Sequence, residues 1–173
     1  MIERPQPTEH VPYFSRYIDL VPEGDILKLL ADQQRDTQAL LETLSEQQAR
    51  YRYADGKWSV AEVIGHLADT ERVFAYRALR FARGDTTPVP GFDENAYTPA
   101  GRFDDRSLGD VAAEFAAVRH ASLALLRSLP RGADERVGSA DGKPVSVRAL
   151  AYIIAGHELH HVKLLRTRYG LSA

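Results

Sequence analysis

The chain has 173 residues, of which 44% are hydrophobic and 27% charged, so its length and composition suit one ordinary globular domain, residues 1–173. Its net charge of −2 argues against the strongly basic surface with which proteins bind nucleic acid or anionic membranes. The chain contains no cysteine, which excludes disulfides, thiolate metal ligands and a protein thiol nucleophile.

The first segment, residues 1–24, is rich in proline and aromatic side chains, and we expect it to form an ordered N-terminal strap. It lacks a basic region followed by an apolar run, which argues against a signal peptide. No part of the sequence approaches the roughly 20 consecutive apolar residues of a membrane-spanning helix. We therefore expect a soluble, cytoplasmic protein that binds neither a membrane nor nucleic acid.

Two helices are predicted next along the chain. Asp25 is a suitable N-cap for the first, because apolar residues follow it at helical spacing as far as about Leu44. The second helix has the clearest start, since Ser59 and Glu62 form a capping box in which each side chain bonds the other's backbone N–H. This helix is expected to end at Gly84.

The remaining chain is predicted to form a long connection and two more helices. Residues 85–106 are punctuated by proline and glycine and form the connection. A third helix is expected to start after Ser107 and to stop before Pro130, and a fourth is expected over 146–169. Between these two, Asp141-Gly142 is a dipeptide typical of a hairpin turn.

Four helices of this length predict an all-α fold, a four-helix bundle. Helices joined by short loops run antiparallel, whereas the connection 85–106 is long enough to span the bundle. The second and third helices are therefore expected to run parallel. The predicted order is up, down, down, up, with the second helix antiparallel to the fourth.

Three histidines can meet in such a bundle. His157 and His161 are one turn apart on the predicted fourth helix, about 6 Å from each other on its apolar face. His66 lies on the apolar face of the second helix, about 10 Å from its start, and His161 lies about 12 Å from the end of the fourth. Antiparallel helices bring them to a similar depth, and neutral imidazoles are good ligands for divalent metals. We predict a metal site on His66, His157 and His161.

The other three histidines are not predicted to be metal ligands. His160 is expected at the edge of the site or on the surface, while His10 and His120 have no partner at a ligand spacing. Residues 157–161 also match the H-E-x-x-H motif of zinc peptidases. Threonine occupies position 167, where metzincins carry a further histidine, so we disfavour the peptidase interpretation.

Four segments resemble the DinB/YfiT-like metalloenzyme superfamily. They are residues 57–69 (KWSVAEVIGHLAD), 156–161 (GHELHH), 17–25 (YIDLVPEGD) and 92–97 (FDENAY). The resemblance implies an up-down-down-up four-helix bundle, frequently a homodimer, with zinc or nickel held by the residues that match the three histidines. Relatives include enzymes that act with low-molecular-weight thiols such as bacillithiol and mycothiol. Tyr97 departs from this pattern, since the thiol transferases carry tryptophan there.

A metal held by three protein ligands keeps an open position, as in catalytic sites. The resemblance makes a metal-dependent transferase our first hypothesis, one that acts on a small-molecule substrate with a low-molecular-weight thiol cosubstrate. An external thiol fits a chain that contains no cysteine. The alternatives are a metal-dependent hydrolase on the same histidines and a bundle that binds a metal or small ligand without catalysis. Glu158 is the candidate catalytic residue, and Glu62 and Asp69 could also orient an imidazole or act as a base.

Overall fold

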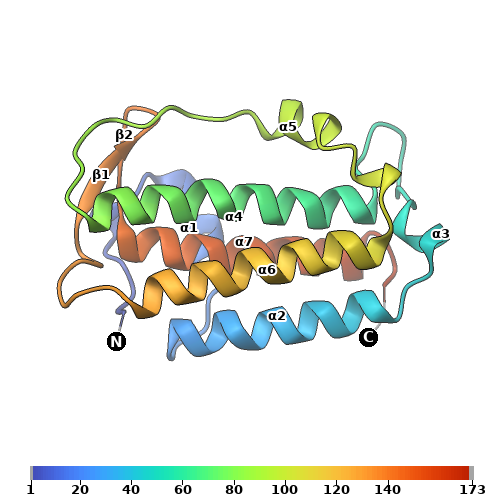
Figure 1. The fold of residues 1–173 in the computed structure, drawn as a ribbon, viewed down its shortest axis with the longest axis horizontal. Helices are drawn as coiled ribbons and strands as arrows, with labels where there is room; N and C mark the ends of the chain where they lie inside the picture. The colour runs from blue at the N-terminus through green and yellow to red at the C-terminus, as the bar shows by residue number, and fades with distance from the viewer. Residues whose placement is uncertain (1, 172–173) are drawn as a thin grey trace.

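The computed structural model describes residues 2–171, and most of them are helical. Four long helices lie side by side in a bundle (Figure 1): α2 (Ile26–Glu42), α4 (Val60–Ala82), α6 (Leu108–Arg127) and α7 (Val147–Thr167). The chain runs in one direction along α2 and α7 and in the other along α4 and α6 (Figure 1). Helices α4 and α7, which carry the three histidines, are thus antiparallel and pack against each other. No helix among residues 2–171 is long and apolar enough to cross a membrane.

The helices begin at the residues whose side chains cap them. In α4, Ser59 Oγ accepts from the backbone N–H of Glu62 at 3.0 Å, and Glu62 Oε2 accepts from that of Ser59 at 2.8 Å. Asp25, Ser107 and Ser146 cap the other three long helices. These caps satisfy N–H groups that have no partner within the helix. They also fix where α4 and α7 begin, and thereby the position of the histidines along each helix.

The all-α expectation is wrong in one segment. Strands β1 (Val137–Ala140) and β2 (Lys143–Ser146) form an antiparallel hairpin. Asp141 and Gly142 make its turn with φ of 54° and 70°, and an Asp-Gly pair tolerates this left-handed conformation. The turn signal was present in the sequence, but strands of this length carry little periodicity. The fold is mostly helical with a small two-stranded sheet.

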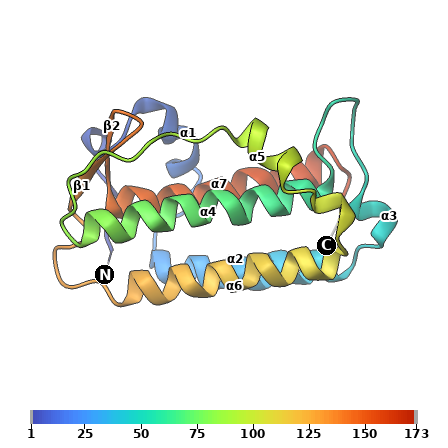
Figure 2. The same ribbon diagram turned by 45° about the horizontal axis from the view of Figure 1, so that its top comes forward.

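The long connection between α4 and α6 is also partly structured. It runs along the length of the bundle (Figure 2) and contains α5 (Glu94–Ala100), followed by the 3₁₀ turn Phe103–Asp105. Along the chain, a short helix, α3 (Glu46–Ala49), follows α2 and precedes α4.

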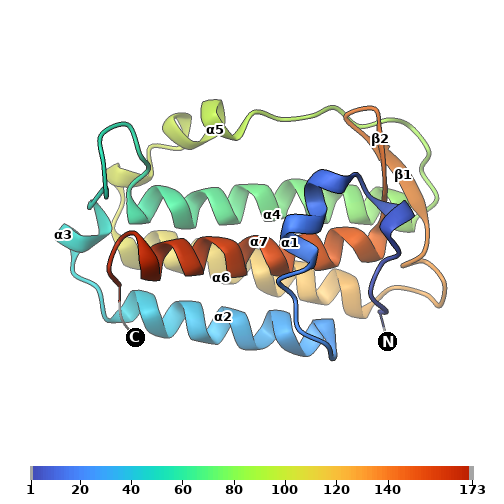
Figure 3. The same ribbon diagram turned by 180° about the vertical axis from the view of Figure 1, so that it is seen from behind.

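The N-terminal strap contains α1 (Ser15–Ile18), which packs against α7 (Figure 3). This contact depends on Gly156 of α7, where an added Cβ would lie 2.0 Å from the carbonyl oxygen of Tyr17. The absence of a side chain at this position lets the strap reach the helix next to His157. The strap thereby becomes one wall beside the histidines.

Replacing Gly156 with alanine is expected to lower the free energy of unfolding by about 2 kcal/mol, because the backbone of α1 must move to accommodate the methyl group. Urea denaturation measures this change. The matched control is Gly109→Ala in α6, where an added Cβ meets no atom within 4 Å. That variant should be at least as stable as the wild type. Equal stability of Gly156→Ala and the wild type would contradict the close contact.

Candidate metal centre

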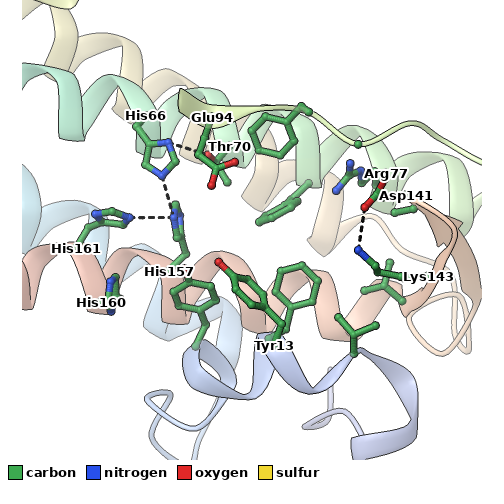
Figure 4. A pocket seen from close by; sticks show the side chains of 18 of the residues that line it. Tyr13, His66, Thr70, Arg77, Glu94, Asp141, Lys143, His157, His160 and His161 are labelled. Atoms are coloured by element: carbon green, nitrogen blue, oxygen red, sulfur yellow. Dashed lines mark hydrogen bonds and ion pairs between the residues drawn. The ribbon is translucent and has the colours of Figure 1, made fainter. Parts of the chain in front are cut away.

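The three predicted histidines meet between α4 and α7 (Figure 4). His66 comes from α4, and His157 and His161 come from successive turns of α7. His157 Nε2 lies 3.1 Å from His66 Nε2 and 3.1 Å from His161 Nε2. One ligand atom from each residue lies within 4.8 Å of the others, and this is the one such group of three or more potential metal ligands among residues 2–171.

All three imidazoles are held in the neutral form. Their side chains are buried, with exposed fractions of 6%, 6% and 9%. Burial lowers the pKa of His66 to about 4 and that of His161 to about 3, and it lowers the pKa of His157 well below its usual value of 6.5. A neutral imidazole keeps the nitrogen lone pair that a metal requires, so the site is ready to bind a cation near pH 7.

The hydrogen-bonding capacity of the cluster also fits a cation. A neutral imidazole has one N–H and one acceptor nitrogen, so His157 Nε2 can form a good hydrogen bond with only one of its two neighbours. A metal placed among the three nitrogens would accept every lone pair. Bonds of about 2.1 Å in tetrahedral geometry separate ligand nitrogens by about 3.4 Å, close to the observed 3.1 Å. The residues present therefore fit a divalent cation with three protein ligands and an open position.

Neighbouring side chains hold the rings in place. Thr70, one turn after His66, has its Oγ1 3.3 Å from His66 Nδ1. The Trp58 ring lies 4.7 Å from the ring of His66, and the Tyr17 ring lies 5.3 Å from that of His157. Contacts of this kind orient metal ligands before the metal arrives, which reduces the cost of binding.

The metal-free protein is expected to lose stability as the pH falls below 6.5. In the unfolded chain these histidines take up protons near pH 6.5, whereas in the folded chain His66 does so only near pH 4 and His161 near pH 3. The unfolded state therefore binds more protons between those values, and stability decreases through that window. His66 alone contributes a loss on the order of 3 kcal/mol.

Urea denaturation of the metal-free protein at pH 7, 6, 5 and 4 measures this dependence. In His66→Gln the loss between pH 7 and 4 should be smaller than in the wild type. An identical pH dependence in the two proteins would contradict the burial of a neutral His66.

The histidines occupy one end of a cavity of about 490 Å³. One wall is a single face of α4, on which His66, Thr70, Phe74 and Arg77 follow one another at helical spacing. The strap contributes aromatic side chains, and the β1–β2 hairpin closes the far end (Figure 4). The cavity can therefore hold a small molecule with one end at the histidines.

The predicted catalytic role of Glu158 does not fit its position. Its carboxylate accepts a hydrogen bond from Thr37 Oγ1 at 2.6 Å and forms an ion pair with Arg119 at 2.8 Å. It points towards α2 and α6 and is absent from the lining of the cavity. Successive residues on a helix point about 100° apart, so the neighbour of a ligand faces another part of the bundle. Glu158 is a buried structural residue.

The other two acidic candidates also lie away from the cavity lining. Glu62 completes the capping box of α4 and pairs with Arg52. Asp69 pairs with Arg72 at 3.2 Å, and burial raises the pKa of its carboxyl. Neither is placed to act on a molecule in the cavity.

The remaining histidines lie as their spacing suggested. His160 lines the cavity, with its ring 5.5 Å from that of Tyr17. His10 contacts the carbonyl of Val11, and His120 contacts Gln34, both outside the cavity lining. These contacts give the two outlying histidines no part in the cluster.

Two carboxylates that were not predicted as site residues line the cavity, Asp141 at the hairpin end and Glu94. Glu94, at the start of α5, lines the cavity at its histidine end (Figure 4). It belongs to the segment 92–97, but no sequence spacing relates it to the histidines, because it reaches the cavity through the connection that runs along the bundle. Tyr97, three residues on, is 48% exposed and does not line the cavity.

Comparison with known proteins gives a family and a fold. The model of the DinB superfamily matches residues 29–165. No curated protein sequence matches the chain. Among solved structures, YfiT from Bacillus subtilis has a TM-score of 0.74 and 19% identity, over 91% of this chain and 99% of that one. It is described as "a probable metal-dependent hydrolase with an unusual four-helix bundle topology".

Two further structures are similar. A mycothiol-dependent maleylpyruvate isomerase has a TM-score of 0.68 and 14% identity, over 85% of this chain and 62% of that one. A DinB-like protein, YjoA, from Bacillus subtilis has a TM-score of 0.62 and 20% identity, over 85% and 90% of the two chains. At these identities the structures show a shared fold, while the family model covers most of the sequence. The chain belongs to the DinB superfamily.

Proposed function

We propose that this protein is a metal-dependent transferase that holds one zinc or nickel ion on His66, His157 and His161 and acts on a small molecule together with a low-molecular-weight thiol. The observation that carries the proposal is the convergence of three neutral Nε2 atoms at one end of a 490 Å³ cavity. When bound, a divalent cation lowers the pKa of a thiol or water molecule that enters its open position.

The protein's own residues supply the rest of the chemistry. The carboxylate of Glu94 is the group in the cavity best suited to accept a proton from an incoming thiol or water. Thr70 orients the imidazole of His66 through its Nδ1. The aromatic side chains of the strap line the cavity beside the histidines and give that wall an apolar surface.

Two observations bear on the choice between thiol transfer and hydrolysis. The chain has no cysteine, so any thiol must arrive on a small molecule, and one similar structure is of a mycothiol-dependent isomerase. Another similar structure, YfiT, is described as a "probable metal-dependent hydrolase". Hydrolysis on the same three histidines is therefore the second candidate, and binding without catalysis is the third.

The test is to measure the metal content of the purified protein and then to assay the zinc- and nickel-loaded forms with monochlorobimane. Mycothiol, bacillithiol, glutathione and cysteine are supplied in turn as the thiol. Thiol-dependent turnover that disappears in His161→Ala and persists in His120→Ala supports the proposal. Turnover of ester substrates without a thiol would favour hydrolysis. Bound metal with no turnover in either assay would leave a binding protein.

Glu94→Gln is expected to lower kcat by about 100-fold while the metal content stays at that of the wild type, because the amide cannot accept the proton. The matched control is Glu42→Gln, at an exposed position of α2 outside the cavity. Steady-state kinetics and metal analysis check both variants. Unchanged kcat in Glu94→Gln would exclude this residue as the base.

The homodimer expected from the family stays a prediction. Size-exclusion chromatography with light scattering would test it.

A further inference from the structure

The end of the cavity opposite the histidines contains a second polar cluster, formed by Arg77, Asp141 and Lys143 (Figure 4). Arg77 belongs to α4, and the other two come from the turn and second strand of the hairpin. Nothing in the proposed chemistry at the histidines uses these residues.

Arg77 is a buried cation that no carboxylate contacts directly, although Asp141, itself paired with Lys143, favours its charge from a distance. Its exposed fraction is 6%, yet it forms no ion pair among residues 2–171. The other deeply buried arginine, Arg119, shows how the fold treats a guanidinium that has only a structural role, since it pairs with both Glu71 and Glu158. A buried charge without a partner is costly, and such a site is stabilised by an anion that enters it.

Neighbouring groups fix the orientation of the Arg77 guanidinium. Its Nη2 donates a hydrogen bond to the carbonyl of Pro90 at 2.8 Å, and its Cζ lies 5.7 Å and 5.8 Å from the ring centres of Phe74 and Phe92. Arginine has five N–H donors, and that bond is the one found among the described residues. The remaining donors, in a fixed orientation, suit the two oxygens of a carboxylate.

The charges at this end favour a singly charged anion. Lys143 Nζ lies 2.9 Å from Asp141 Oδ2, and this exposed pair is neutral as a whole. Arg77 therefore leaves one net positive charge, which one carboxylate neutralises and a doubly charged phosphate does not. At the histidine end, Glu94 repels a carboxylate, so an anionic ligand group is directed to Arg77.

The spacing between the two ends sets the shape of the ligand. Arg77 follows His66 by three turns of α4 on the same face, so their Cα atoms are roughly 16 Å apart. The wall between them carries Phe74 and Phe92. A molecule that reaches both ends must be elongated and apolar in the middle.

We propose that this cavity binds an elongated substrate through a terminal carboxylate on Arg77, with an apolar middle along Phe74 and Phe92 and its reactive group at the three histidines. The placement of the reactive group rests on the metal site of the proposed function. The carboxylate site stands on Arg77 alone and can be tested without the metal.

The test uses the zinc-loaded 173-residue protein and two series of hydroxamates, since a hydroxamate group binds zinc. One series ends in a carboxylate: succinic, adipic, suberic and sebacic monohydroxamates. The other consists of alkyl hydroxamates of matched length that end in a methyl group. Calorimetry should show that the best-fitting carboxylate binds at least about 10-fold more tightly than its methyl-ended partner, as expected for charge-assisted hydrogen bonds.

Variants at Arg77 test whether this residue causes the preference for the carboxylate-ended hydroxamates. In Arg77→Met the preference should fall below about twofold while the affinity for the methyl-ended hydroxamate is unchanged. Arg77→Lys, which keeps the charge but not the planar fork, should retain part of it. The control Lys28→Gln removes an exposed lysine of α2 and should retain all of it. Circular dichroism confirms that each variant is folded.

Equal affinity for the two series in the wild type would overturn the proposal, as would a preference that persists in Arg77→Met. If neither series binds because the histidines hold no zinc, the metal site has failed and the carboxylate site is tested separately. Metal-free protein is then titrated with phenylbutyrate and its neutral amide. A preference for the carboxylate that requires Arg77 supports the site, and the absence of any preference overturns it.

Discussion

Replacing His157 with alanine is expected to abolish stoichiometric zinc binding, with an affinity loss of at least about 100-fold. His157 Nε2 lies 3.1 Å from the Nε2 atoms of both His66 and His161, so it is the central ligand of the three. Its removal leaves only two protein ligands for the metal. Metal analysis and calorimetry measure the change. Zinc at 100 times the wild-type Kd should stabilise the wild type by about 2.7 kcal/mol and His157→Ala by less than about 0.5 kcal/mol.

The control for this experiment is His160→Ala. It removes a histidine that lines the same cavity but lies outside the cluster of three. Zinc should bind this variant with the affinity of the wild type. Stoichiometric binding retained in single alanine variants at all three of His66, His157 and His161 would refute the metal site.

Arg119→Met is expected to lower the free energy of unfolding by about 3–5 kcal/mol. Arg119 is 1% exposed, and its guanidinium bonds Glu71, Glu158 and the carbonyl oxygen of Leu30. Burial opposes its charge, but the carboxylates of Glu158 and Glu71 raise its pKa above the usual value. Methionine would leave these two carboxylates buried without a cation. Guanidinium chloride denaturation measures the loss.

A surface arginine provides the comparison. Arg35 pairs with Asp32 on α2, but its side chain is 68% exposed. Arg35→Met should change stability by less than about 1 kcal/mol. Adding Glu71→Gln and Glu158→Gln to Arg119→Met should recover part of the loss, because no unpaired charge then remains. A loss in Arg119→Met as small as that in Arg35→Met would contradict the buried network.

The position of Glu158 does not fit the catalytic role that was predicted for it from the sequence. It is adjacent to His157, and that proximity suggested a role in catalysis. The backbone rotates about 100° per residue, so His157 faces α4 while Glu158 faces α2 and α6. Glu94, by contrast, is separated from the histidines along the chain, and it lines the cavity because the connection that contains α5 runs along the bundle.

The sequence by itself determined the features that depend on local interactions. Caps such as Ser59 and the apolar spacing of the long helices depend on residues within a few positions of one another, as does the one-turn separation of His157 and His161. Only the tertiary structure decided what those helices enclose. The cavity, the position of Glu94 beside it and the unpaired charge of Arg77 arise from contacts between distant segments, for which the local pattern contains no information.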